Sequence, residues 1–364
     1  MWFADESSMR RGLRLGLLLC LVLGAAGARA GEVEGLYEAQ VPVAGQREAE
    51  RTQALREVFG RVLVKITGDR DAAARPALQA LLRSPLTYVQ QYLYRPLPPG
   101  YLPEAAADPA PTQMLWARFD AQAVNQSLQR VNEPVWGRMR PSTLVWLAVE
   151  EQGRRYLAGS EAGADLRREV EERADARGIP LLFPLLDLED QRRVSFGDVW
   201  GGFDQEVRAA SARYQSTAVL LGRAYRAPSG AWSARWSLYM DEGAEHWQSA
   251  EGTRAQALAD GVDGAADRLA ARFARALDGG AAEPVDLLVT GVNRLEDYSR
   301  AQHYLRSLDA VSELEVRQID AAGAHFHLVL HADRAALVQA IGFGRVLVPA
   351  GAATGDELAY RLVP

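Results

Sequence analysis

The sequence predicts a mixed protein of the α/β and α+β classes, built from three successive units. Apolar residues follow helical and strand periodicities in alternation from about residue 33 onward. In the middle of the chain the order β-α-β-α-β favours a parallel sheet, and near the end the order βαββαβ is typical of a ferredoxin-like unit. We therefore expect an N-terminal α+β domain at 31–140, a central α/β domain at 141–280 and a C-terminal ferredoxin-like domain at 284–364.

The first unit should combine three strands with a long amphipathic helix. Between residues 47 and 64, apolar side chains recur at Leu55, Val58 and Val62, which is the spacing of one helix face. Asp120 is suited to cap a later helix, because its carboxylate can accept from the free N–H groups of the first turn. The other expected elements are strands at 35–43, 88–94 and 115–119 and helices at 76–82 and 121–130.

The central unit should hold a parallel sheet with an added antiparallel hairpin. Residues 143–149 form a continuous apolar run, the pattern of a strand buried on both faces. A helix at 165–177 should end at Gly178, since glycine is the preferred residue just beyond a helix C-terminus. The remaining elements are strands at 179–186 and 218–225, a helix at 203–214, a hairpin of 232–240 with 246–250, and a helix at 255–277 followed by a linker at 278–283.

The third unit has the clearest order of elements. Its two hairpin strands, 311–319 and 325–331, lie between two segments with helical spacing. Residues 358–363 are expected to add an edge strand. The other elements are strands at 285–292 and 345–348 and helices at 295–308 and 333–341.

The first thirty residues have the pattern of a secretory signal peptide. Three arginines between residues 10 and 14 precede an apolar run at 15–24, and the sequence Ala-Arg-Ala ending at Ala30 fits the small-residue cleavage rule. The apolar run is short for a membrane-spanning helix. We expect cleavage between Ala30 and Gly31 and export to the periplasm.

Two details of this leader bear on the mature protein. Translation from Met9 would remove Asp5 and Glu6, which do not suit a positively charged start. The single cysteine, Cys20, lies inside the apolar run, and Leu19 stands before it where a lipoprotein site needs a small residue. The sequence therefore favours loss of Cys20 with the leader over a lipid anchor, which leaves a cysteine-free mature chain.

The charge balance argues against several classes of partner. The chain has 41 lysines and arginines against 47 acidic residues, a net charge of −6. An acidic exported protein is a poor partner for nucleic acid or for an anionic membrane surface. Lys65 is the only lysine, and the codon usage of a GC-rich genome accounts for the many scattered arginines.

An acidic and aromatic stretch after the second parallel strand is the candidate binding site. Open parallel sheets bind ligands beyond the carboxyl ends of their strands, where this stretch and the residue after the first strand would meet. Such residues could contact a partner or ligand, support glycoside hydrolysis through two carboxylates, or simply form a solvated loop. The candidates are Glu150, Asp187, Asp190, Asp198 and Trp200.

A histidine cluster near the C-terminus is a weaker candidate, for a metal. Strand alternation places His325, His327 and His331 on one face, and two histidines at i and i+2 can share a metal. At ~3.3 Å per residue, His331 is too far from His327 to complete that site. If the hairpin has a bulge, Glu315 or Arg317 lies opposite His327. The alternative is a polar strand face that happens to carry histidine.

Signatures of other chemistry are missing from the sequence. It has no G-x-G-x-x-G or GK[ST] loop for phosphates and no G-x-S-x-G elbow, and Ser160 and Ser195 each lack a nearby histidine. We therefore predict no cofactor.

Several separate segments of the sequence carry a resemblance to a known family. The segments are LYEAQVPVAGQ (36–46), VLVKITGDR (62–70), FDAQAVNQSLQRVNEPVWG (119–137), RPSTLVWLAVE (140–150), RGIPLLFPLLDLED (177–190), RYQSTAVLLGR (213–223) and the tryptophans at 232 and 236. Together they resemble an uncharacterised family of Gram-negative envelope proteins, known as domain of unknown function 2066. The resemblance implies an exported protein and carries no activity, cofactor or catalytic residue. The central unit is also similar at fold level to small domains of periplasmic assembly proteins, such as the N-terminal domain of the translocation protein TolB.

From these features we expect an exported, non-catalytic protein that binds or organises an envelope protein or glycan. The mature chain should have no transmembrane segment. The alternatives are a carboxylate-based hydrolase of an envelope glycan and a metal-binding protein that uses His325 and His327.

Overall fold

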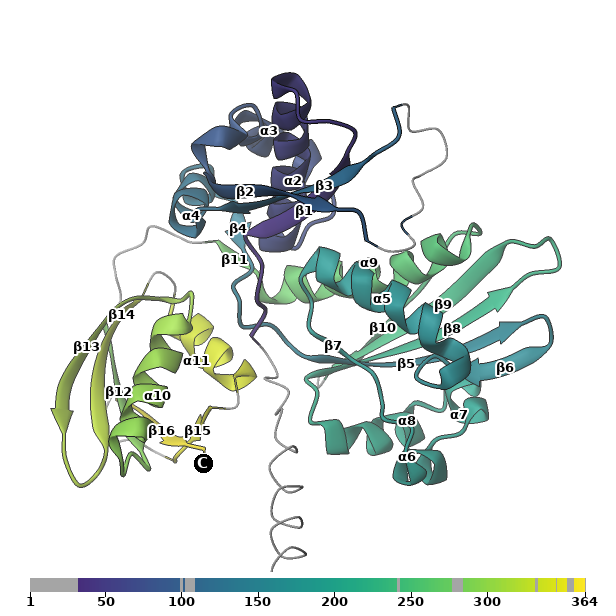
Figure 1. Cartoon of the computed structure of the whole chain (residues 1–364). Helices are drawn as coiled ribbons and strands as arrows, with labels where there is room; N and C mark the ends of the chain where they lie inside the picture. Colours follow the sequence, from purple (N-terminus) through teal and green to yellow (C-terminus); the bar gives the residue numbers. More distant parts are fainter. Residues whose placement is uncertain are drawn as a thin grey trace, which may run out of the picture.

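The computed structural model shows a mixed α/β protein in which helices pack on three sheets (Figure 1). The structure describes residues 32–98, 101, 109–240, 243–276, 284–330, 333–344, 346–351 and 357–363. The predicted leader, with Cys20 and the Ala30–Gly31 cleavage site, lies outside these residues. Within them, no helix is both long enough and apolar enough to span a membrane.

The N-terminal sheet is antiparallel and carries helices on one face only. The strand order is β1-β3-β2, so the last strand in sequence lies in the middle. Helix α2 packs closely against β1 and β3. The elements are β1 (Glu38–Val43), α2 (Glu48–Thr67), α3 (Pro76–Leu82), β2 (Val89–Pro96), β3 (Gln113–Phe119) and α4 (Ala121–Arg130).

Strand alternation gives the two faces of this sheet different characters. Val41, Leu115 and Phe119 point into a core shared with the helices and are almost fully buried. The opposite face is not covered by α2, and the register places Gln40 beside Trp116 and Leu93 upon it. This second face borders the central part of the molecule.

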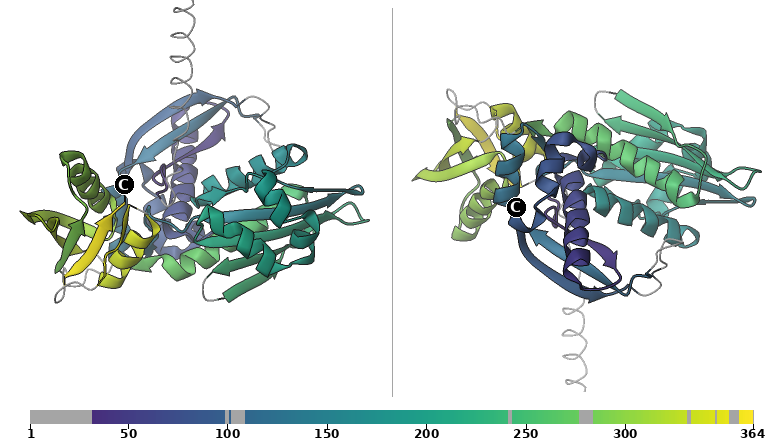
Figure 2. Two further views of the ribbon diagram at one scale, coloured as in Figure 1. Left: turned by 90° about the horizontal axis from the view of Figure 1, so that it is seen from below. Right: turned by 90° about the horizontal axis from the view of Figure 1, so that it is seen from above.

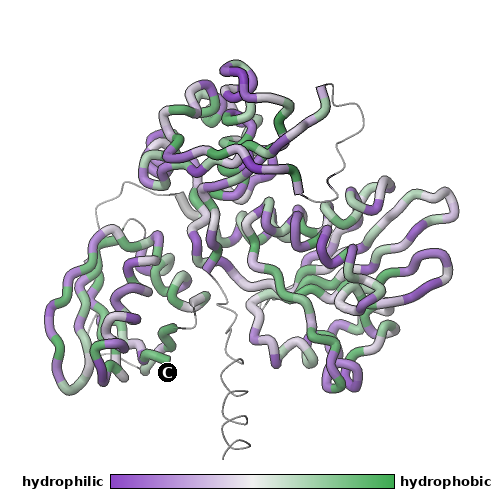
Figure 3. Tube along the Cα trace, viewed as in Figure 1, coloured by the Kyte–Doolittle hydropathy of each residue, from purple (hydrophilic) through white to green (hydrophobic). Residues whose placement is uncertain are grey.

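The central sheet has the strand order β10-β9-β8-β5-β6, and β7 also pairs with β5. As predicted, β5 pairs in parallel with both β7 and β8, and β9 and β10 form an antiparallel hairpin. Strand β5 is apolar along most of its length, whereas the turn that follows it is hydrophilic (Figure 3). The strands are β5 (Thr143–Glu151), β6 (Arg154–Leu157), β7 (Leu181–Leu182), β8 (Ala218–Arg226), β9 (Trp232–Met240) and β10 (Gly243–Gln248).

Two details of this sheet differ from the prediction. The strand expected at 179–186 is reduced to Leu181–Leu182, because Pro180 and Pro184 on either side lack the N–H group that a ladder needs. A strand at Arg154–Leu157 was not predicted, and it turns back on β5 through Gln152 and Gly153, both at positive φ.

Helices cover both faces of the central sheet, on two separate cores (Figure 2). One core holds the long helices α5 and α9, and Trp236 is buried against it. The other holds three short helices around Trp146 and Val199. The helices are α5 (Ala164–Arg177), α6 (Leu188–Arg193), α7 (Phe196–Gly201), α8 (Asp204–Ser211) and α9 (Arg254–Phe273).

The C-terminal sheet has the strand order β13-β14-β12-β16-β15. The prediction of an edge strand at 358–363 was wrong, since β16 lies inside the sheet, parallel to β12 and antiparallel to β15. The elements are β12 (Pro284–Thr290), α10 (Leu295–Ser307), β13 (Val311–Ile319), β14 (Ala324–Leu330), α11 (Arg334–Phe343), β15 (Leu347–Pro349) and β16 (Leu358–Leu362).

A short segment at 134–140, which we call the junction segment, joins the three sheets. Val135 belongs to the core of the N-terminal sheet, Trp136 to the α5–α9 core, and Met139 to the core of the C-terminal sheet. Strand β4 (Pro134–Val135) also pairs with β11 (Arg275–Ala276), which follows α9. Side chains from one short stretch therefore enter three different cores.

Candidate binding site

The acidic residues predicted to bind a partner are instead engaged with their own neighbours. Asp187 is the N-cap of α6: it accepts from the backbone N–H groups of Glu189 and Asp190 and from both terminal nitrogens of Arg213, at 2.8 and 2.9 Å. The fully buried Asp190 accepts from Arg213 at 3.0 Å and from the hydroxyl of Tyr214. This acid cluster therefore fixes the start of α6 to the end of α8.

This arrangement suits a structural role better than glycoside hydrolysis. A general acid needs a raised pKa, so that it holds a proton at neutral pH. The guanidinium of Arg213 does the reverse and holds the pKa of Asp187 far below its usual range. Because one arginine bridges Asp187 and Asp190, they do not form an open acid–base pair.

The other three predicted residues lie apart from that cluster. Asp198 forms a capping box with Ser195 at the start of α7, and Trp200 stacks on Phe196 at 5.4 Å between ring centres. Glu150 pairs with Arg155 across the β5–β6 hairpin at 2.9 Å. Within the described residues, no hydrogen bond or ion pair joins Glu150 or Asp198 to Asp187 or Asp190. Glu150 and Trp200 both neighbour Tyr225 of β8, whereas Asp187 and Asp190 share Arg213.

The histidines share a sheet face but each has its own carboxylate. His325 contacts Glu357 at 2.9 Å, and His327 contacts Asp286 at 2.6 Å. Bulges in β13 bring Glu315 opposite His327, as predicted. In the part of the chain that the structure describes, no three potential ligands are grouped as a metal would require. His331 lies outside that part.

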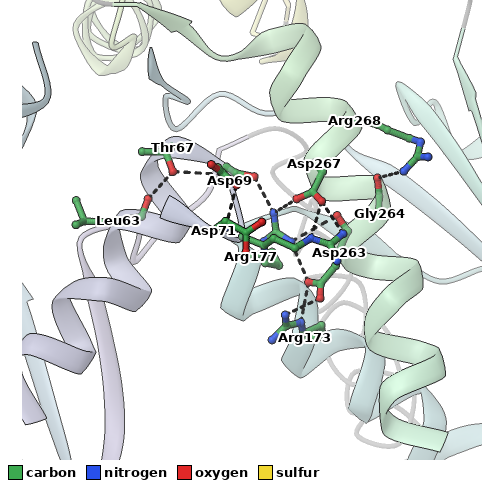
Figure 4. Close-up of polar contacts among 12 residues, drawn as sticks. Leu63, Thr67, Asp69, Asp71, Arg173, Arg177, Asp263, Gly264, Asp267 and Arg268 are labelled. Carbon is green, nitrogen blue, oxygen red and sulfur yellow. Dashed lines mark hydrogen bonds and ion pairs between the residues drawn. The ribbon is translucent and has the colours of Figure 1, made fainter. Parts of the chain in front are cut away.

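A buried polar network joins α2, α5 and α9 (Figure 4). Arg177 of α5 is 1% exposed and donates to Asp263 at 2.9 Å and Asp267 at 2.6 Å, both on α9, and to the carbonyl oxygen of Gly68 at 2.7 Å. Arg173 adds a two-point contact with Asp263. Charge-assisted bonds of this kind define the angle between helices that belong to different parts of the fold.

Arg140, in the junction segment, also joins separate parts of the fold through buried hydrogen bonds. Its guanidinium is fully buried and donates to the carbonyl oxygens of Lys65, Trp136 and Gly178 at 2.6 to 2.7 Å. It also stacks on the ring of Trp136 at 4.1 Å. Burial lowers the pKa of Arg140 to about 9, so the group stays charged at neutral pH.

Beside this network, the uncovered face of the N-terminal sheet and helix α5 border an open pocket of about 600 Å³, which we call the cleft. Gln40 and Trp116 line it from the sheet, and Asp175 lines it from α5. Pockets of this size, placed between separately packed units, are common sites for small ligands. The residues that line the cleft come from segments more than 100 positions apart in the sequence.

Lys65, the only lysine of the chain, lies in this cleft. Its ammonium group is half-buried and donates to the carbonyl oxygens of Gly35 at 3.3 Å and Glu38 at 3.1 Å. Loss of solvent lowers the pKa of Lys65, although Asp175 and Glu38 act in the opposite direction. An ammonium group has three donors, so one is left for a ligand.

Arg95 and Asp175 also face the cleft, and neither has an ion-pair partner among the described residues. The guanidinium of Arg95 lies over the ring of Trp116, 4.6 Å from its centre, and helps to reduce the exposure of that ring to 8%. The Asp175 carboxyl keeps contact with solvent at the rim, and the atoms packed around it raise its pKa, with a further contribution from Glu171. Other surface arginines, such as Arg118 and Arg167, are paired with acids.

Sequence reasoning noted Lys65 but assigned it no role. The composition did contain a signal. The chain has 40 arginines and a single lysine, Lys65, whose ammonium group is smaller than a guanidinium group. Arg95, Trp116 and Asp175 carry no sequence motif. They meet only because the N-terminal sheet lies against α5.

The described residues thus form a mixed α/β protein with a charged cleft between two of its units. A family model described as a domain of unknown function, DUF8605, matches residues 30–137, which include the N-terminal sheet and its helices. The resemblance to domain of unknown function 2066 was therefore wrong. Its first three segments lie within the matched part, and their strand and helix periodicities are patterns that many families share. No curated protein matches the chain.

Proposed function

We propose that this chain is an exported, non-catalytic binding protein of the cell envelope, and that the cleft is its binding site. One observation carries the proposal. Lys65, Arg95 and Asp175 line a single cavity of about 600 Å³ without ion-pair partners among the described residues. In contrast, the acids of the α6 cluster are held by Arg213.

The leader supports the export part of the proposal. Arginines, an apolar run and a small-residue motif ending at Ala30 occur in the order that secretion requires. A mature chain that begins at Gly31 has no cysteine, which suits an oxidising compartment.

The finer description of the fold is part of this proposal. We propose that the C-terminal unit, 284–364, is a ferredoxin-like variant in which β16 has been inserted between β12 and β15; the support is the order β12-α10-β13-β14-α11-β15. The central unit, 141–280, would resemble the N-terminal domain of TolB through its parallel strands and antiparallel hairpin. The N-terminal unit would be 31–140. Each unit has at least one hydrophobic core that is mostly its own.

Crosslinking inside cells tests the binding function. A photo-crosslinking amino acid replaces Gln40, an exposed residue of the cleft. The matched control carries it at Glu206, an exposed position on α8 away from the cleft. We expect crosslinks to an envelope component, identified by mass spectrometry, from position 40 alone. Equal yields from both positions, or none from position 40, would contradict the proposed site.

Export is tested separately, by fractionation and by sequencing the N-terminus of the purified protein. We expect release with the periplasmic fraction and a first residue at Gly31. A protein that retains residues 9–30 and fractionates with the cytoplasm would contradict the proposal.

A further inference from the structure

We infer that the cleft binds a small zwitterion of the amino acid or short peptide class. The ligand carboxylate would lie at Lys65 and Arg95, and its ammonium group at Asp175. This inference rests on the proposed function, because it assigns a ligand to the same cleft.

The positive end of the cleft has donors that the protein itself leaves unused. Two of the three Lys65 donors are occupied by the carbonyl oxygens of Gly35 and Glu38, which aim the ammonium group and leave one N–H for a ligand. Arg95 stacks on Trp116, so its position is held by the ring while its in-plane N–H groups have no acceptor among the described residues. A ligand carboxylate in the cleft can therefore accept charge-assisted hydrogen bonds from these free N–H groups.

The neighbouring arginine on the same sheet face does not compete for this role. Arg118 lies 5.3 Å from the centre of the Trp116 ring, but it donates to Glu38 through two nitrogens at 2.8 and 2.9 Å. Its charge is therefore already balanced. Lys65 and Arg95 remain the cations available to a ligand.

The negative end is supplied by α5. Asp175 has no side-chain hydrogen bond or ion pair within the described residues, whereas Glu171, one turn earlier, is paired with Arg167 at 2.8 Å. Lys65 and Asp175 influence each other's charge but do not approach to ion-pair distance. Opposite charges that face one cavity without contact are best bridged by a molecule carrying the complementary pair.

The other charges of the cleft restrict the ligand further. A ligand with two negative groups would meet Glu32 and Glu34 as well as Asp175, and one with two positive groups would meet Lys65 and Arg95. A molecule with one charge of each sign avoids both conflicts. A volume of about 600 Å³ is sufficient for a short peptide.

Calorimetry with three matched peptides tests the inference on the mature chain. The probes are tri-alanine, its N-acetyl form, which lacks the ammonium group, and its C-terminal amide, which lacks the carboxylate. We expect tri-alanine to bind at least tenfold more tightly than either blocked form, which corresponds to about 1.4 kcal/mol at each end. Equal binding of all three, or binding of none, would overturn the inference.

Two variants then test which residue of the cleft binds each charged end of the peptide. Asp175→Asn should remove the preference for a free amine, and Lys65→Met should reduce the preference for a free carboxylate, because Arg95 remains. Glu172→Gln is the matched control, because Glu172 is an exposed acid on the same helix that does not line the cleft. If Lys65→Met fails to fold, Asp175→Asn at the rim still tests the inference. In that variant, losing the preferences for a free amine and a free carboxylate together, or keeping both, would contradict the role given to Asp175.

Failure of the ligand assignment can be distinguished from failure of the proposed function. If none of the peptides binds while position 40 still crosslinks to an envelope component, the ligand class is wrong and the cleft remains a binding site. If position 40 fails as well, both proposals fail.

Discussion

Trp136 and Met139 are three residues apart in the chain, yet their side chains lie in different hydrophobic cores. Trp136 packs in the α5–α9 core and Met139 in the core of the C-terminal sheet, while Val135 lies in the core of the N-terminal sheet. A short segment shared among three cores couples their stabilities. It also fixes the position of the N-terminal sheet over α5, and so determines the shape of the cleft.

Loss of Arg140 should destabilise the packing of the elements that meet at the junction segment. Arg140→Met leaves buried carbonyl oxygens of Lys65, Trp136 and Gly178 without a donor, and each such group costs about 1–3 kcal/mol. We expect the free energy of unfolding to fall by about 3–5 kcal/mol, measured by urea denaturation. Arg168→Met is the control, since its contacts are on the surface and contribute about 0.5 kcal/mol. A similar effect of the two changes would contradict the role of Arg140.

Adding a methyl group at Gly68 should lower the stability of the fold far more than adding one at another glycine with the same backbone conformation. Gly68 has φ of 73°, and an added Cβ would lie 2.3 Å from Ala270 Cβ and 2.8 Å from the Trp136 ring. Gly153 has φ of 77° and open space around it. We expect Gly153→Ala to cost about 1 kcal/mol from backbone strain alone, and Gly68→Ala to cost at least 2 kcal/mol more. Equal melting temperatures for the two variants would show that α2 and α9 separate easily at this point.

The network of Asp263 should make stability depend on acid pH. Burial alone would raise the pKa of Asp263, but the hydrogen bonds and charges of Arg173 and Arg177 outweigh burial and lower it. A carboxyl whose pKa is lower in the folded state stabilises the fold above its unfolded pKa of about 3.9, and this contribution disappears as the pH falls through the folded value.

Wild type should therefore lose stability more steeply than Asp263→Asn as the pH falls below about 4. The measurement is the free energy of unfolding at a series of pH values. At neutral pH the variant should already be less stable by about 3–5 kcal/mol, because Arg173 and Arg177 lose the buried Asp263 carboxylate and Arg177 keeps only the more exposed Asp267. Parallel pH profiles would rule out the ionised Asp263 as the cause.

The single lysine provides a direct probe of the cleft. Reductive methylation with ¹³C-formaldehyde labels only Lys65 and the N-terminal amine, so the lysine gives one side-chain signal. Because loss of solvent lowers the pKa of Lys65, its signal should titrate below the usual lysine value of about 10.4. In Asp175→Asn the titration should shift lower still, since Asp175 favours the charged form. An unshifted titration in the wild type would mean that Lys65 is solvated and that the cleft is open to bulk water.

Much of the secondary structure could be predicted, because it depends on local periodicity. The alternating and helical patterns placed α2, α5, β5, β8, α9 and the β13–β14 hairpin close to their observed positions. Errors arose where pairing is decided over a distance. The prolines around β7 shortened that strand, and β16 entered the sheet beside β12 because its apolar side chains Tyr360 and Leu362 could be buried there.

The structural contacts of the predicted site residues could not be foreseen for a related reason. Asp187, Asp190 and Asp198 were selected as acids in a loop, but acids at the first turns of short helices are also the residues that cap them. A sequence shows that a carboxylate is present, and it does not show that Arg213, 26 residues later, will occupy it.

The sequence by itself determined the alternation of helices and strands, the pattern of an export leader and the presence of one lysine, because each of these depends on the order or number of residues. Only the tertiary structure decided that Lys65, Arg95 and Asp175 face one cavity. Their meeting depends on how the N-terminal sheet is held over α5. That relation is set by the buried contacts of Arg140, Arg177 and Trp136, which join parts of the chain that no local pattern connects.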